Sequence, residues 1–193
     1  MKTIIIAIIT ASIGFTACNS SNTKSAENSS SENNQTSATT PSSSSNGEAT
    51  PVKGIVSSYL NLKNALANDN GQAAANAANE FLEAMNKIDK SSLTEGQKKV
   101  YADVADDAKE MAEHISKSAD KIDHQREHFD MLSQDMYDLV KAFGTGQTLY
   151  QDFCPMYNDN KGAYWISETK EIKNPYLGKE MPSCGEVKEE IKQ

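Results

Sequence analysis

The chain has 193 residues and a formal net charge of −8, from 27 acidic and 19 basic side chains. This acidic balance argues against nucleic acid or an anionic lipid surface as a partner, and it mildly favours cations. Beyond an N-terminal segment of unusual composition, about 140 residues remain, which is enough for one domain with a single core.

The N-terminus has the pattern of a secretory signal. One lysine precedes an apolar run from Ile4 to Ile9, and small residues then lead to Cys18. The run is too short for a stable membrane-spanning helix. Phe15-Thr16-Ala17 followed by cysteine resembles the lipobox of bacterial lipoproteins, which implies a signal peptide at 1–17 and lipidation of Cys18. The alternative is an ordinary signal peptide with an incidental cysteine.

Residues 18–51 are rich in serine, asparagine and threonine, and apart from proline they contain no apolar side chain larger than alanine after Cys18. Such a segment cannot bury enough surface to offset the entropy of ordering. We therefore expect a disordered linker, attached through its lipid to the membrane. The expected location is the cell envelope, at the outer membrane, with the domain facing the periplasm or the cell surface.

Four stretches carry apolar residues at the spacing of three and four that is typical of amphipathic helices. They cover residues 52–66, 74–88, 101–122 and 129–143. Four such helices with short connections predict an all-α fold, an up-down four-helix bundle within a domain at 52–193. The link between the third and fourth stretches has no glycine or proline, so these two are alternatively one long helix.

The sequence changes character after Gly146, where prolines, glycines and aromatic residues become frequent. A weak strand signal covers residues 148–153. We expect the rest to be an irregular tail that is held by contacts other than helical hydrogen bonds.

The chain contains three histidines. His124 and His128 are four residues apart, so on a helix they share a face, with the spacing of a two-histidine metal pair. The zinc-protease pattern is absent, because Gln125 stands where that pattern needs glutamate. Both side chains are alternatively solvated helix residues, and His114 is expected at the surface or at its boundary with the core.

A cysteine-based enzyme has little support. Cys154 is followed by a proline, which removes a backbone N–H that a helix-start thiolate would use, and no triad-type context is present. We therefore expect no catalytic residues and no enzymatic activity.

Two segments each place a cysteine near a methionine, as Cys154-x-Met156 and Met181-x-x-Cys184. Thiolate and thioether are soft ligands that select Cu(I), Ag(I) or Zn, and Trp165 could shield a bound cation. Alternatively, the two cysteines form a disulfide, which an extracytoplasmic setting allows and which would contribute about 3 to 4 kcal/mol. Spacing alone supports the metal site and the disulfide equally.

Longer motifs extend from the fourth helical stretch to the C-terminus. Their residues are Arg126, Phe129, Leu132 and Ser133; Cys154, Pro155 and Met156; Trp165; Asn174, Pro175, Tyr176 and Gly178; and Met181, Cys184 and Gly185. Together they resemble an uncharacterised domain-of-unknown-function family of Bacteroidetes-type lipoproteins. That family also occurs as the C-terminal domain of periplasmic adaptor subunits of copper and silver efflux pumps. The resemblance runs from about Val52 to the end.

The resemblance implies a heavy-metal context, with copper as the expected ion and efflux-pump components as possible partners. It favours a metal site over a purely structural disulfide. The expected ligands are Cys154, Met156, Met181 and Cys184, with His128 assisting. Residues expected to hold the tail in place are Arg126, Ser133, Trp165, Asn174, Pro175, Tyr176 and Gly178. The alternative function is a disulfide-stapled interaction module of the envelope, without metal.

Overall fold

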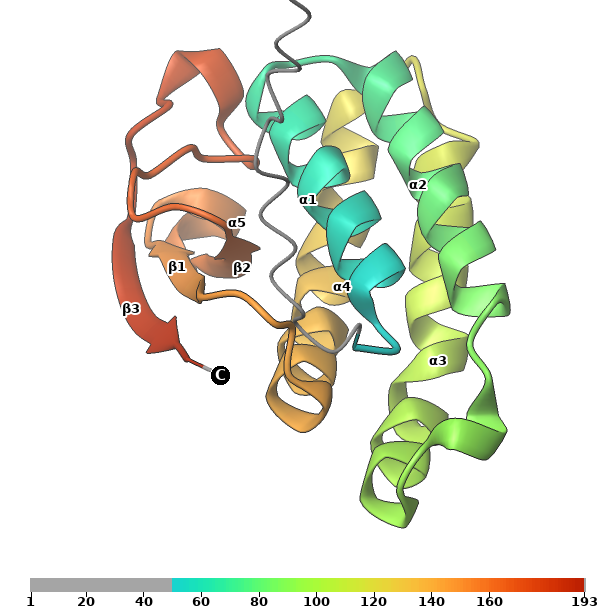
Figure 1. Cartoon of the computed structure of the whole chain (residues 1–193). Helices are drawn as coiled ribbons and strands as arrows, with labels where there is room; N and C mark the ends of the chain where they lie inside the picture. Colours follow the sequence, from blue (N-terminus) through green and yellow to red (C-terminus); the bar gives the residue numbers. More distant parts are fainter. Residues whose placement is uncertain (1–49, 193) are drawn as a thin grey trace, which may run out of the picture. The chain divides into compact units, whose positions relative to one another are not determined.

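The computed structural model describes residues 50–192, in which four long helices precede a small sheet (Figure 1). The expected signal peptide at 1–17, the lipidation site Cys18 and nearly all of the linker lie outside these residues. The helices are α1 (Lys53–Ala67), α2 (Gly71–Asn86), α3 (Glu95–Ser116) and α4 (Ile122–Phe143). In the described part of the chain, no helix combines the length and apolarity needed to cross a membrane.

Local signals explain where these helices begin. The Asn70 side chain accepts a hydrogen bond from the Ala73 N–H and caps α2. Thr94 and Gln97 form a capping box at the start of α3, in which each side chain accepts a hydrogen bond from the backbone N–H of the other residue. These side chains satisfy N–H groups that have no partner within their own helix.

The third and fourth helical stretches belong to separate helices, but the predicted end of the third, at residue 122, is wrong. Helix α3 ends at Ser116, residues 117–121 form a turn, and Ile122 is the first residue of α4. The Ser118 N–H donates to the Ile115 carbonyl, and the Lys121 N–H donates to the Ser118 carbonyl. The buried Gln125 amide donates to the carbonyls of Ile115 and Gly71 at 3.0 and 2.9 Å. These contacts join the turn to the start of α2 and fold α4 back along α3.

Consecutive helices pack against each other, α1 on α2, α2 on α3 and α3 on α4, and their short connections make neighbours antiparallel (Figure 1). The predicted up-down bundle is therefore present. Its core is formed by the predicted apolar faces, and its large side chains include Tyr59, Phe81, Phe129 and Met136, all fully buried. Tyr59 and Phe129 stack with ring centroids 5.2 Å apart.

The prediction of a purely α fold is wrong for the C-terminal part. Residues after the bundle form an antiparallel sheet in the order β2-β1-β3, from β1 (Leu149–Cys154), β2 (Ala163–Ser167) and β3 (Glu186–Ile191). The short helix α5 (Tyr157–Asn160) lies between β1 and β2. The weak strand signal at 148–153 corresponds to β1. The other two strands lack the alternation of apolar and polar residues that identifies a half-buried strand.

Strand β2 attaches the sheet to the bundle, because it packs against α4 and α1. The Tyr59 hydroxyl accepts a hydrogen bond from the Ile166 N–H at 3.0 Å and lies 2.8 Å from the Ser133 hydroxyl. One buried hydroxyl therefore links α1, α4 and β2. Strand β3 is an edge strand with four charged residues, a composition that protects an exposed edge against pairing with other chains.

Candidate metal centre

The two cysteines of the domain meet at the end of the β1–β3 pair. Cys154 is the last residue of β1, and Cys184 precedes β3 by two residues. Pairing of Phe153 with Glu186 brings the two segments together. Both cysteines are free thiols, and their sulfur atoms are 3.2 Å apart. A disulfide bond is about 2.05 Å long. A small movement of the two sulfurs toward each other would therefore form a disulfide, and a small movement apart would make room for a metal ion between them.

The two thiols differ in their surroundings. Cys154 is fully buried, whereas Cys184 is partly exposed. Burial, together with the adjacent Cys154 sulfur, raises the pKa of the Cys184 thiol, and the backbone amide of Met156 partly offsets this rise. Cys184 is therefore protonated at neutral pH, and an ion that binds here must displace its proton.

Both methionines predicted as ligands are at the surface. Met156 is 49 % exposed and Met181 is 37 % exposed. Their backbones adjoin Cys184, since the Met156 amide lies beside its thiol and the Met181 carbonyl accepts its N–H at 3.1 Å. These side chains do not fill gaps in the core, which is the usual structural role of methionine. Core packing therefore does not fix either thioether.

Asn174 organises the segment that carries Cys184. Its side-chain amide donates to the Cys184 carbonyl at 2.6 Å, and its side-chain oxygen accepts the N–H groups of Tyr176 and Leu177. Its own N–H donates to the Pro182 carbonyl at 2.9 Å. One fully buried side chain thus fixes the turn that positions the second cysteine.

Arg126 anchors the same turn to the bundle from α4. Its guanidinium donates to the Pro175 carbonyl at 2.9 Å, to the Leu66 carbonyl at 3.2 Å and to Asp69 at 2.6 Å. Gly178 has a φ of +52°, and a Cβ atom there would meet both Asp69 and Arg126. The chain passes so close to this ion pair that only glycine fits.

Trp165 and Tyr176 pack on the core side of the segment that carries Cys184. Trp165 is fully buried, and a Cβ atom on Gly185 would meet its ring. Tyr176 packs edge-on against Trp165 and donates its hydroxyl hydrogen to the Tyr164 carbonyl. The tryptophan therefore supports the backbone after Cys184. Ser133 makes its hydrogen bonds with Tyr59 and the Phe129 carbonyl, so it reaches β2 only through Tyr59.

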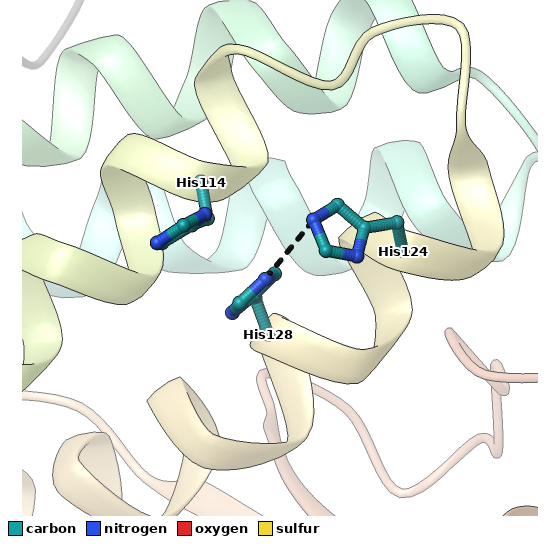
Figure 2. A group of neighbouring side chains, drawn as sticks. All are labelled: His114, His124 and His128. Carbon is teal, nitrogen blue, oxygen red and sulfur yellow. Dashed lines mark hydrogen bonds between the residues drawn. The ribbon is translucent and has the colours of Figure 1, made fainter.

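His128 does not join the thiols. It lies with the other two histidines, His124 on the same helix and His114 on α3, as Figure 2 shows. One ligand atom from each of the three side chains lies within 4.8 Å of the others. Among residues 50–192 this is the one group of three or more His, Cys, Asp or Glu side chains with such spacing. Burial, with His114 and His124 adjacent, lowers the pKa of His128.

Sequence patterns missed a second group of polar residues, buried between α1 and the sheet. Lys63 is fully buried, and its ammonium group lies 2.6 Å from Glu168. Burial lowers the pKa of Lys63 despite this partner. Asp152 on β1 is also fully buried, and burial raises its pKa to about 7. An acidic residue within a short strand has no sequence signal that would have revealed its burial.

Comparison with known proteins adds one match. No curated protein and no solved structure matches the chain. Residues 55–148 match the model of a family described as "Protein of unknown function (DUF3347)". The match covers nearly all of the bundle, including the three histidines, and ends just before β1. It supports the assignment of the helical part of the chain to a domain family of unknown function.

Proposed function

We propose that the protein is a lipid-anchored envelope protein that binds a soft metal ion, with Cu(I) as the expected ion, and stores it or passes it to a partner. The observation that carries the proposal is the pair of free thiols, Cys154 and Cys184, whose sulfurs lie 3.2 Å apart at the end of the β1–β3 pair, where Cys184 is partly exposed. The resemblance to envelope lipoproteins and to copper and silver pump adaptors supports the choice of ion and of partner.

The ligand chemistry suits this ion. Thiolate and thioether sulfurs select Cu(I) over hard cations such as Mg and Ca. Cys154 and Cys184 supply the two thiolates, and the exposed Met156 and Met181 supply thioethers from the same two segments. His128 is not a ligand in this proposal, because it lies in a separate group with two other histidines.

The position of the site suits exchange of the ion. Cys154 is buried and fixed by β1, so it holds one side of the ion rigidly, whereas Cys184 and both methionines reach solvent. A partner protein with its own sulfur ligands can approach from that side. The expected linker and lipid anchor would keep the domain near membrane-bound pump components. The proposal includes no catalytic step.

A second candidate function follows from the same 3.2 Å contact. Oxidation would join Cys154 and Cys184 and leave an interaction module with a stapled tail and no metal. The two candidates are distinguished by the redox state of the purified protein and by what the reduced form binds.

The test is an anaerobic Cu(I) titration of the reduced protein against a competing chelator. We expect one-to-one binding tighter than about micromolar, a range typical of specific sites. The changes Cys154→Ser and Met156→Leu should both weaken it, and Met131→Leu is the matched control, because Met131 is an exposed methionine on α4. Binding no tighter than the chelator background would leave the disulfide-stapled module as the function.

A further inference from the structure

We infer that His114, His124 and His128 form a second metal site, which binds a divalent transition-metal ion through three imidazole nitrogens. The site joins the end of α3 to the beginning of α4 (Figure 2). It contains every histidine of the chain and no cysteine. It is independent of the thiol pair and does not rest on the function proposed for that pair.

The fold brings the three side chains together. The turn at 117–121 reverses the chain, so the last turn of α3 lies beside the first two turns of α4. His124 and His128 are one helical turn apart on α4 and share a face. His114 faces them from α3, and its ring stacks on that of His128 with centroids 4.4 Å apart and planes at 11°.

The distances fit a small ion. The Nε2 atoms of His124 and His128 are 3.2 Å apart. A tetrahedral ion with metal–nitrogen bonds of about 2.0–2.1 Å keeps its ligand atoms roughly 3.3 Å apart. Two of the three donors therefore already have the separation that coordination requires. The His114 side chain is 49 % exposed and can rotate out of its stacked position to supply the third.

Hydrogen bonds at the opposite ring nitrogens orient both imidazoles of α4. The Glu127 carboxylate lies 3.3 Å from Nδ1 of His124, and the Met111 sulfur lies 3.3 Å from Nδ1 of His128. An ionised carboxylate and a thioether accept hydrogen bonds and cannot donate them. They favour the tautomers with hydrogen on Nδ1. In these tautomers neither Nε2 atom carries a hydrogen, so their lone pairs repel each other across 3.2 Å. A cation bound between the two nitrogens would remove this repulsion.

His124 shares a feature of metal-binding histidines, which commonly donate their second ring N–H to a carboxylate. Two carboxylates adjoin the cluster, because Glu110 lies 3.9 Å from Nε2 of His114 and Glu127 lies 3.3 Å from Nδ1 of His124. The nearby Arg126 is engaged with Asp69 and the Pro175 carbonyl.

The donor set selects the class of ion. Neutral imidazole suits Zn²⁺, Cu²⁺ and Ni²⁺, and affinity within this class is highest for Cu²⁺. Three protein ligands leave a fourth position for water or for a ligand from a partner, in contrast to closed structural zinc sites with four protein ligands. The cluster therefore fits an exchangeable ion bound near the surface.

Because every histidine of the chain lies in this cluster, nitrogen ligation can be assigned without ambiguity. The experiment is a Zn²⁺ titration against a chromophoric chelator of the full chain carrying Cys154→Ser and Cys184→Ser, because the thiol pair would itself take up Zn²⁺. Electron paramagnetic resonance of the same protein loaded with Cu²⁺ is the second measurement. We expect one Zn²⁺ per chain and hyperfine coupling to imidazole nitrogen. His114→Gln and His128→Gln should each weaken Zn²⁺ binding at least about tenfold, and Glu127→Gln by about tenfold.

Two controls make the outcomes decisive. Asp106→Asn, an exposed carboxylate on α3, should leave Zn²⁺ affinity unchanged. The protein with both Cys154→Ser and Cys184→Ser should retain the site, so loss of Cu(I) binding with retained Zn²⁺ binding separates the two proposals. Since the His114 ring is exposed, His114→Gln should keep the helical circular dichroism. Zn²⁺ affinity that survives both histidine changes, or Cu²⁺ spectra without nitrogen coupling, would overturn the inference.

Discussion

Replacing Asp152 by asparagine should stabilise the protein at alkaline pH and have little such effect in acid. Asp152 lies on β1 opposite Trp165, is fully buried, and neither of its carboxylate oxygens has a hydrogen-bond partner. Burial raises its pKa from 3.8 to about 7, even though the ammonium group of Lys63 attracts the carboxylate. The ionised form is therefore costly in the folded protein.

The sign of the effect follows from proton binding. Between pH 4 and 7 the folded protein holds a proton on Asp152 that the unfolded chain has released, so stability falls as pH rises through this window. This loss of stability is absent at a pH below the pKa of Asp152 in the unfolded chain, and it is complete at a pH above its pKa in the folded protein. A pKa that rises from 3.8 to about 7 corresponds to about 4 kcal/mol. The asparagine side chain carries no charge at any of these pH values, so this loss should disappear in the variant.

Urea unfolding of wild type and Asp152→Asn, followed by circular dichroism from pH 4 to 8.5, measures this difference. The free energy of unfolding of the variant, relative to wild type, should rise by up to about 4 kcal/mol between pH 4 and 7 and then level off. Asp106→Asn, at an exposed position, is the control. A difference that stays constant across this range would refute the reasoning, because it would mean that Asp152 ionises as easily in the folded protein as in the unfolded one.

Three further changes test how the tail and sheet are attached. Arg126→Met should lower the free energy of unfolding by about 3 kcal/mol, because it removes the guanidinium bonds to Leu66 and Asp69 and leaves the Pro175 carbonyl without its donor; unchanged urea midpoints would contradict this. Gly178→Ala should lower the free energy of unfolding by about 1–3 kcal/mol, through backbone strain and the clash of the new Cβ with Asp69. Gly96→Ala, where the new Cβ meets no neighbour, should leave stability unchanged or slightly raised in the same urea experiments. Tyr59→Phe should cost about 1–3 kcal/mol and accelerate hydrogen exchange at the Ile166 amide.

The bundle was predictable because its helices bury one face. Apolar residues at helical spacing between residues 52 and 66 predicted a helix that the structure places at Lys53–Ala67, and the fourth stretch is likewise part of α4. The break between α3 and α4 was left open, since its stabilising contact is a buried glutamine, Gln125, whose partners include a residue of α2. A contact between distant parts of the chain leaves no local pattern.

The sheet was largely missed for two physical reasons. Strand β2 packs against α4 and α1 and is buried at every residue except Tyr164, so it shows a short apolar run in place of alternation. Strand β3 has four charged residues, which suit an edge strand but are typical of loops and helices as well. Only β1 had a weak strand signal.

The candidate sites were predictable in part. Helical spacing put His124 and His128 on one face, but their proximity to His114 depends on the turn at 117–121. The approach of Cys154 to Cys184 depends on the pairing of β1 with β3, which no residue near either cysteine indicates. Residue types thus predicted the chemistry of the ligands, whereas the fold decides which of them meet.

X-ray absorption of the protein loaded anaerobically with one equivalent of Cu(I) tests the central proposal most directly. The thiol pair predicts a first coordination shell made of sulfur alone, from Cys154, Cys184 and at least one methionine. Replacing Met156 by leucine should reduce the number of sulfur ligands or shift binding to Met181. A first shell dominated by nitrogen would place Cu(I) at the histidines, and failure to retain copper would contradict soft-metal binding by this protein.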